Sequence, residues 1–305
     1  MIPFEYRTPK SLKEVHQELK EFGADAKLIA GGTALVIMMK QRLVRPSSLI
    51  SLRMVRGLNG IAEKDGALRI GGLATHREVE TSTLVRRRVP LLAETYRHVA
   101  TIRVRNMATV GGGLAHADPN QDPPPTLMVL GATLKASSAG GSRVIALEEF
   151  FTDYYETVLK PDEIITEVSV PRLPANSGGA FVKFLPRTAD DYATVSAAAV
   201  VTLDRARKIF TDVRIALGSV GTTPIRAREA EAVLRGQPVK REALREAAEK
   251  VRQAVDPVSD FRGSAAYKKE MAVVFVRRAL EMALDNLPKK SKARRSPKAS
   301  RRRNK

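Results

Sequence analysis

Two glycine-centred segments decide how this chain is expected to fold: Leu28-Ile29-Ala30-Gly31-Gly32-Thr33-Ala34-Leu35 and Thr109-Val110-Gly111-Gly112-Gly113-Leu114-Ala115-His116-Ala117-Asp118-Pro119. Each segment places an apolar, strand-like run before paired glycines, and small or hydroxyl residues follow. Because glycine has no side chain, the backbone can approach a bound anion closely and point several N–H groups at it, as a phosphate requires. Two such segments predict a ligand with two phosphates, held from both sides.

The first segment predicts a strand at 27–30, a turn at Gly31-Gly32 and a helix at 33–42. A helix that starts after such a turn aims its first N–H groups and the Thr33 hydroxyl at an anion. The segment is no Rossmann fingerprint, because the third glycine is missing, and no Walker A loop, because no Gly-Lys-Ser/Thr follows. Taken alone, the segment is more often a tight turn with nothing bound.

The second segment opens a region from 111 to 125 that we predict to be a long loop, stiffened by four prolines. A stiff loop that holds backbone donors in fixed directions is organised for binding before the ligand arrives. Asp122 is a candidate acceptor for ribityl or ribose hydroxyls, and turn formation before proline is the alternative role of Asp118 and Asp122. Gly-Gly pairs also recur at positions 31, 71 and 111, which we interpret as coincidence because the intervening sequences differ in type.

Composition limits the classes of protein that this chain can represent. It has 305 residues, 43% of them apolar, and no apolar stretch long enough to span a bilayer. The first residues lack the pattern of a secretory signal, so we expect a cytoplasmic protein. The absence of cysteine excludes disulfides, thiolate metal sites and an ordinary iron–sulfur cluster on this chain. Four scattered histidines predict no metal site.

The net charge of +19 is concentrated at the C-terminus. Residues 289–305 contain ten lysines or arginines, no acid and no large apolar side chain. Such a segment buries too little surface to offset its ordering entropy, so we predict a disordered basic tail at 286–305. A basic nucleic-acid-binding protein is therefore one alternative, although 5% aromatic residues and no tryptophan offer no stacking platform.

The positions of glycine- and proline-rich stretches predict three folded parts before the tail. The proline- and glycine-rich stretch 171–179 is expected to be a linker. Beyond it, three strands at 180–185, 193–203 and 209–217 precede three helices at 225–234, 241–255 and 265–284. The predicted division is an α/β part at 1–54, a mixed β-rich part at 55–175 and an α+β part at 178–285.

Together these motifs resemble a known family. Both glycine motifs occur in order with Met39-Lys40 and Asp122, and Glu163-Ile164-Ile165, Phe181-Val182-Lys183-Phe184 and Asp191-Tyr192-Ala193-Thr194-Val195 add to the likeness. From about residue 3 to residue 284, the chain resembles the FAD-binding medium subunit of molybdenum hydroxylases, such as carbon monoxide dehydrogenase and xanthine dehydrogenase. The chain departs from the family at Gly113, where asparagine is usual, at Ala34, where a polar residue is common, and at Ile37, where proline is common.

The resemblance implies an α+β protein: an FAD-binding fold of the vanillyl-alcohol oxidase type with two subdomains, then a small C-terminal domain with a three-stranded sheet and helices. It implies non-covalent FAD, no metal site and no residue that acts on the organic substrate. The implied cofactor-binding residues are Leu28, Ile29, Ala30, Gly31, Gly32, Thr33, Ala34, Leu35, Val36, Thr109, Val110, Gly111, Gly112, Gly113, Asp122, Ile165, Lys183 and Tyr192. Lys183 and Tyr192 are expected near the flavin ring, with a solvent-facing strand lysine as the alternative for Lys183.

The resemblance also implies partners. A large molybdopterin subunit would oxidise the substrate, a small subunit with [2Fe-2S] clusters would relay electrons, and FAD on this chain would pass them to an external acceptor. A dimer of heterotrimers is expected. The remaining alternative is a stand-alone flavin oxidase of the vanillyl-alcohol type, in which His76 or His116 would be the candidate for a covalent flavin link.

Overall fold

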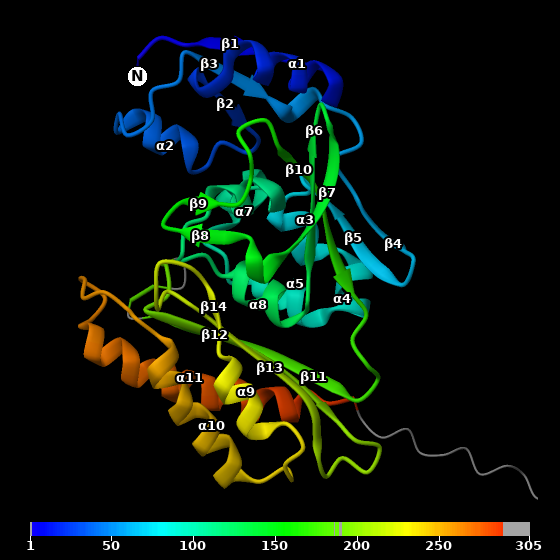
Figure 1. Cartoon of the computed structure of the whole chain (residues 1–305), viewed down its shortest axis with the longest axis vertical. Helices are drawn as coiled ribbons and strands as arrows, with labels where there is room; N and C mark the ends of the chain where they lie inside the picture. The colour runs from blue at the N-terminus through cyan, green and yellow to red at the C-terminus, as the bar shows by residue number, and fades with distance from the viewer. Residues whose placement is uncertain (1, 186, 189–190, 289–305) are drawn as a thin grey trace, which may run out of the picture.

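The computed structural model describes residues 2–185, 187–188 and 191–288. Three parts follow one another along the long axis of the molecule, each built on its own β-sheet (Figure 1). The predicted α+β fold is confirmed. Residues 289–305 of the predicted basic tail lie outside the described residues.

The first part is a three-stranded parallel sheet in the order β1-β3-β2, with two helices. Its elements are β1 (Glu5–Arg7), α1 (Leu12–Phe22), β2 (Ala26–Ile29), α2 (Leu35–Lys40) and β3 (Ser48–Ser51). Ser11 caps helix α1, because its hydroxyl accepts a hydrogen bond from the Glu14 N–H at 3.2 Å. Helix α2 is shorter than predicted at both ends.

The second part is a five-stranded antiparallel sheet in the order β4-β5-β10-β6-β7. Its strands are β4 (Ile61–Lys64), β5 (Ala67–Gly71), β6 (Thr133–Ser138), β7 (Gly141–Ala146) and β10 (Ile164–Pro171), and β8 (Phe151–Asp153) pairs separately with β9 (Glu156–Thr157). The β4–β5 hairpin turns at Asp65 and Gly66, whose φ angles of 52° and 75° are those of a type I′ turn. Strands β8 and β9 were not predicted.

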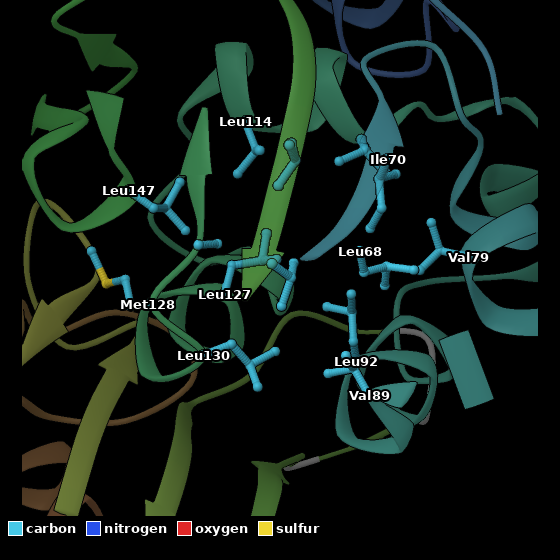
Figure 2. Close-up of a cluster of buried hydrophobic side chains, with 14 of the residues drawn as sticks. Leu68, Ile70, Val79, Val89, Leu92, Leu114, Leu127, Met128, Leu130 and Leu147 are labelled. Carbon is cyan, nitrogen blue, oxygen red and sulfur yellow. The ribbon is translucent and has the colours of Figure 1, made fainter. Parts of the chain in front are cut away.

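The second part also has six helices. They are α3 (His76–Thr81), α4 (Thr83–Arg88), α5 (Pro90–Arg97), α6 (Ile102–Met107), α7 (Val110–His116) and α8 (Pro123–Val129). Two of them, α5 and α8, lie between its sheet and the C-terminal part (Figure 1). Figure 2 shows the core that the helices of this part share with the sheet, in which Ile70 of β5 faces side chains such as Val79 of α3 and Leu127 of α8.

The C-terminal part is a four-stranded antiparallel sheet in the order β11-β12-β13-β14, with three helices. Its elements are β11 (Ser177–Phe184), β12 (Val195–Leu203), β13 (Phe210–Gly218), β14 (Ile225–Arg226), α9 (Arg228–Leu234), α10 (Arg241–Ala254) and α11 (Ala265–Asp285). The three predicted strands form, and β14 adds a two-residue fourth strand where a helix was expected from Ile225. Strand β12 is buried along its whole length, because α5 and α8 cover one face of the sheet while α9 and α11 cover the other.

The prediction of a long loop at 111–125 is wrong, because α7 and α8 occupy most of it. Glycine is a poor helix former, yet Gly111 packs so tightly that an added Cβ would lie 2.8 Å from the Gly72 carbonyl oxygen. The prolines at 123–125 occupy the first turn of α8, where a missing N–H costs no helical hydrogen bond. Tertiary packing therefore overrides local propensity here.

The core predicts a large stability difference between two positions in one hairpin. Leu134 of β6 is fully buried, whereas Val144 of β7 is 70% exposed. Leu134→Ala should lower the free energy of unfolding, measured by urea denaturation, by about 2–5 kcal/mol through lost transfer energy and a cavity. Val144→Ala should change it by less than about 0.5 kcal/mol. Equal effects would contradict the assigned strand register.

Candidate functional site

A cavity of about 650 Å³ lies where the first sheet, the helices of the second part and one end of the C-terminal sheet meet. Its wall includes residues from both glycine segments, from the 72–76 and 99–104 stretches, from the start of β10 and from the end of β11. All predicted cofactor-binding residues line this cavity except Val36 and Val110. Segments that are separated in the sequence thus form a single site.

The two glycine segments meet at this cavity. A Cβ atom on Gly31 would overlap the carbonyl oxygen of Met107, and a Cβ on Gly112 would lie 3.5 Å from the Cβ of Ala30. Glycine is required at Gly31 because the end of α6 leaves no room for a side chain. The convergence that the two sequence motifs predict is therefore confirmed.

A third glycine pair belongs to the same site. Gly72 lines the cavity, and a Cβ there would overlap the carbonyl oxygen of Ile165. The Gly111 N–H donates to the Gly72 carbonyl oxygen at 2.8 Å. The recurrence of Gly-Gly at 31, 71 and 111 is no structural repeat, but each pair marks a close backbone crossing. Our interpretation of the recurrence as coincidence missed Gly72.

The backbone N–H groups of the two segments differ in availability. Within the residues that the structure describes, no protein acceptor takes a hydrogen bond from the N–H groups of residues 31–34. In the second segment the first four N–H groups of helix α7 all have protein acceptors. Val110 donates to the Ala74 carbonyl oxygen and Gly111 to the Gly72 carbonyl oxygen, whereas Gly112 and Gly113 donate to the hydroxyl and carbonyl oxygens of Thr109. The expectation that both segments present free donors is wrong for the second, whose glycines instead allow close approach.

Lys183 and Asp122 form a buried ion pair in the cavity wall. Lys183 Nζ lies 2.8 Å from Asp122 Oδ2 and also donates to the His98 carbonyl oxygen at 3.1 Å. Their side chains are 2% and 4% exposed, so the solvent-facing alternative for Lys183 is wrong. Asp122 Oδ1 is buried without a hydrogen-bond partner among the described residues. Sequence reasoning named both residues but missed their contact, because β11 and the start of α8 are far apart in the chain.

Burial sets the protonation of two groups at the cavity. Burial raises the pKa of the Asp122 carboxyl to about 6, although the Lys183 ammonium acts in the opposite direction. Because this pKa is still below 7, the carboxylate is mostly ionised at neutral pH. Burial lowers the pKa of His76 to about 4, which makes this imidazole neutral. Its Nε2 would lie 3.3 Å from a Cβ on Gly113, beneath the second glycine segment.

The remaining predicted residues lie at the edges of the cavity. Ile165 contributes a buried apolar side chain at the start of β10, and Tyr192 is 44% exposed at the cavity wall, with the Arg262 guanidinium 5.7 Å from its ring. At Gly113, the Gln121 amide donates to the glycine carbonyl oxygen at 2.9 Å and fills part of the space beside it. The wall residues Val99, Ala100 and Val104 were missed, because apolar residues in a short turn and a short helix carry no motif.

Other kinds of site find no support in the described part of the chain. No three histidine or acidic side chains there come together as metal ligands. None of its helices combines the length and the apolar character that crossing a membrane requires.

Comparison with known proteins places the chain in a family. Residues 2–173 match the FAD binding domain in molybdopterin dehydrogenase, and residues 180–283 match the CO dehydrogenase flavoprotein C-terminal domain. The chain is 36% identical over 285 residues to the carbon monoxide dehydrogenase medium chain of Hydrogenophaga pseudoflava, covering 93% of this chain and 98% of that protein. It is 37% identical over 281 residues to the 6-hydroxypseudooxynicotine dehydrogenase complex subunit alpha of Paenarthrobacter nicotinovorans, covering 92% and 94%.

The structural comparison agrees. A chain of the H. pseudoflava carbon monoxide dehydrogenase that lacks the Mo-pyranopterin moiety superposes with a TM-score of 0.91 at 37% identity, covering 94% of this chain and all of that chain. A chain of quinoline 2-oxidoreductase from Pseudomonas putida 86 superposes with a TM-score of 0.87 at 35% identity, covering 93% and 98%. The chain therefore belongs to the FAD-binding medium subunits of molybdenum hydroxylases of the carbon monoxide dehydrogenase and xanthine dehydrogenase type. It is an FAD-dependent oxidoreductase subunit.

The cavity fits FAD in three respects. Its volume of about 650 Å³ suits a large cofactor. The N–H groups of residues 31–34, which have no partner among the described residues, offer donors for a diphosphate. The buried, unpartnered Asp122 Oδ1 offers an acceptor for a donor group of the cofactor.

The buried ion pair predicts an unequal cost of single and double substitutions. Asp122→Ala leaves the Lys183 ammonium buried without a counter-ion, so the free energy of unfolding of the FAD-free protein should fall by about 3–5 kcal/mol. The double variant Asp122→Ala/Lys183→Met should recover much of this loss, because it removes both charges. Urea denaturation at neutral pH measures both effects. An additive double variant would show that the two charges do not interact.

Proposed function

We propose that this chain is the electron-transfer subunit of a heteromeric molybdenum hydroxylase. It takes electrons from a partner subunit that carries [2Fe-2S] clusters and passes them to an external acceptor, while a third subunit carries the molybdopterin cofactor. The relative from H. pseudoflava, a carbon monoxide dehydrogenase medium chain, supports this assignment. The absence of cysteine supports it too, because ordinary iron–sulfur clusters need thiolate ligands from another chain.

The single observation that carries the proposal is the convergence of the glycine segments on one cavity that also holds the Asp122–Lys183 pair. In the proposed site, the N–H groups of residues 31–34 and the Thr33 hydroxyl bind the diphosphate of FAD. Gly111, Gly112 and Gly113 let the second wall approach it closely. When bound, FAD supplies the ability to exchange electrons singly with a donor and in pairs with an acceptor.

Lys183 and Asp122 set the charge at the other side of the proposed site. The Lys183 ammonium stabilises negative charge on the bound cofactor, because it lies in a buried wall where water does not screen it. Asp122 holds that ammonium in place and offers its free oxygen to a hydroxyl or N–H of the cofactor. Ile165 and Tyr192 complete the wall with apolar and aromatic surface.

The proposal extends to organisation. Residues 1–54 and 55–175 form the two FAD-binding subdomains, and residues 178–285 form the C-terminal domain, whose sheet contributes Lys183 to the site. The working assembly is a dimer of heterotrimers in the cytoplasm. The basic segment from residue 286 onward is an appendage with no part in FAD binding.

Purification from the source cells tests this function. The affinity-tagged chain should co-purify with two companion chains, and the complex should contain FAD, molybdenum and iron by absorbance and metal analysis. The isolated chain should bind FAD but oxidise no organic substrate, because it has no substrate-oxidising centre of its own. A tagged chain that elutes alone and oxidises an alcohol or an aldehyde by itself would support the stand-alone oxidase instead.

A further inference from the structure

Beside the cavity lies a buried ion pair that no motif predicted. Arg105 Nε donates to Glu80 Oε2 at 2.9 Å, and the two side chains are 12% and 7% exposed. Arg105 belongs to α6 and Glu80 to α3. Each helix also contributes a residue to the cavity wall, Val104 and His76 respectively. The ion pair therefore joins two helices that form the wall without itself facing the cavity.

The same guanidinium holds a turn of the wall. Arg105 NH1 donates to the carbonyl oxygens of Val99 and Ala100 at 2.8 and 2.7 Å. Both residues line the cavity, and Ala100 has a φ of 39°, which is unfavourable for a residue with a Cβ. Hydrogen bonds from a charged donor are stronger than neutral ones, so Arg105 stabilises a backbone conformation that alanine does not favour.

Helix α6 connects this turn to the first glycine segment. The helix ends at Met107, whose carbonyl oxygen packs against Gly31 with no room for a Cβ. The His76 N–H donates to the Ala108 carbonyl oxygen at 2.9 Å, which ties the end of α6 to the start of α3. A shift of α6 would therefore disturb the close contact at Gly31, next to the N–H groups of residues 31–34.

A second arginine, Arg77, allows the effect of charge on FAD binding to be distinguished from the effect of wall position. Arg77 NH1 donates to the other oxygen of Glu80 at 2.7 Å, so two guanidinium groups share one carboxylate. Loss of either arginine removes one positive charge near the cavity. Only Arg105 contacts the carbonyl oxygens of Val99 and Ala100. Comparing the two arginines therefore distinguishes attraction of an anion from positioning of the wall.

We propose that Arg105 is a positioning residue of the FAD site, held by Glu80, which fixes the 99–100 turn and α6 in the arrangement that receives the cofactor. The inference rests on the proposed binding of FAD in this cavity. Arginine is required because its planar fork donates from separate nitrogens to the carboxylate and to the two carbonyl oxygens. A lysine keeps the charge but has all its donors on one nitrogen.

Titration of FAD into the FAD-depleted full-length chain, followed by flavin fluorescence, tests the proposal. Arg105→Gln should weaken FAD binding by about 10- to 100-fold, because small displacements of a binding wall have effects of this size. Arg105→Lys should weaken it nearly as much, since charge alone does not hold the turn. Arg77→Gln should leave the affinity close to that of the wild type.

Arg226→Gln is the matched control for loss of a buried arginine. Arg226 is 12% exposed, pairs with the buried Glu231 at 2.7 Å and does not line the cavity. The Arg226→Gln variant should lower the unfolding temperature about as much as Arg105→Gln does, without changing FAD affinity. If Arg105→Gln does not fold, Arg105→Lys carries the test, because it retains the charge and most of the apolar stem.

Three outcomes would overturn the inference. If Arg105→Lys binds FAD as tightly as the wild type, or if Arg77→Gln loses as much FAD affinity as Arg105→Gln, the loss of affinity is due to charge. Unchanged affinity in both Arg105 variants would show that the ion pair serves only the general fold. Failure of the wild-type chain to bind FAD is a separate result, since it would contradict the proposed function and not this inference alone.

Discussion

The site depends on close backbone crossings that only glycine permits. Gly31 packs against Met107, Gly72 against Ile165, and Gly111 against Gly72, in each case where a Cβ atom would collide with or press on a carbonyl oxygen. These contacts bring the turn after β2, the start of β10 and helix α7 together around one cavity. A methyl group at any of them would separate the walls before any ligand contact was affected.

The two glycine segments have different roles at the site. The first keeps the N–H groups of residues 31–34 free of protein acceptors among the described residues, whereas the second uses its N–H groups to fix its own position. Charge is supplied by the buried Lys183 in the wall and by Arg105 behind it. Each is paired with a carboxylate, which lowers the cost of burying a positive charge next to a site for an anionic cofactor.

Much of this arrangement could be predicted from the sequence. The strand before the first glycine pair and the three long strands of the C-terminal part were predicted correctly, and Asp65-Gly66 is a local sequence signal for the turn of the β4–β5 hairpin. The helix at Val110–His116 could not be predicted, because three consecutive glycines disfavour a helix. Here the neighbouring backbones approach so closely that there is no space for side chains, and this packing is not visible in the local sequence. The Asp122–Lys183 and Glu80–Arg105 pairs join residues distant in the chain, so no local pattern signals them.

Binding of FAD by a Gly112→Asp variant tests the central claim most directly. Gly112 lies on the cavity wall beside Ala30, so an aspartate there would collide with Thr109 and place negative charge next to the free N–H groups. Fluorescence titration should show saturable FAD binding by the wild-type chain and by the control Gly140→Asp, which lies in an exposed turn, and none by Gly112→Asp. A folded Gly112→Asp variant that binds FAD as tightly as the wild type would contradict the account.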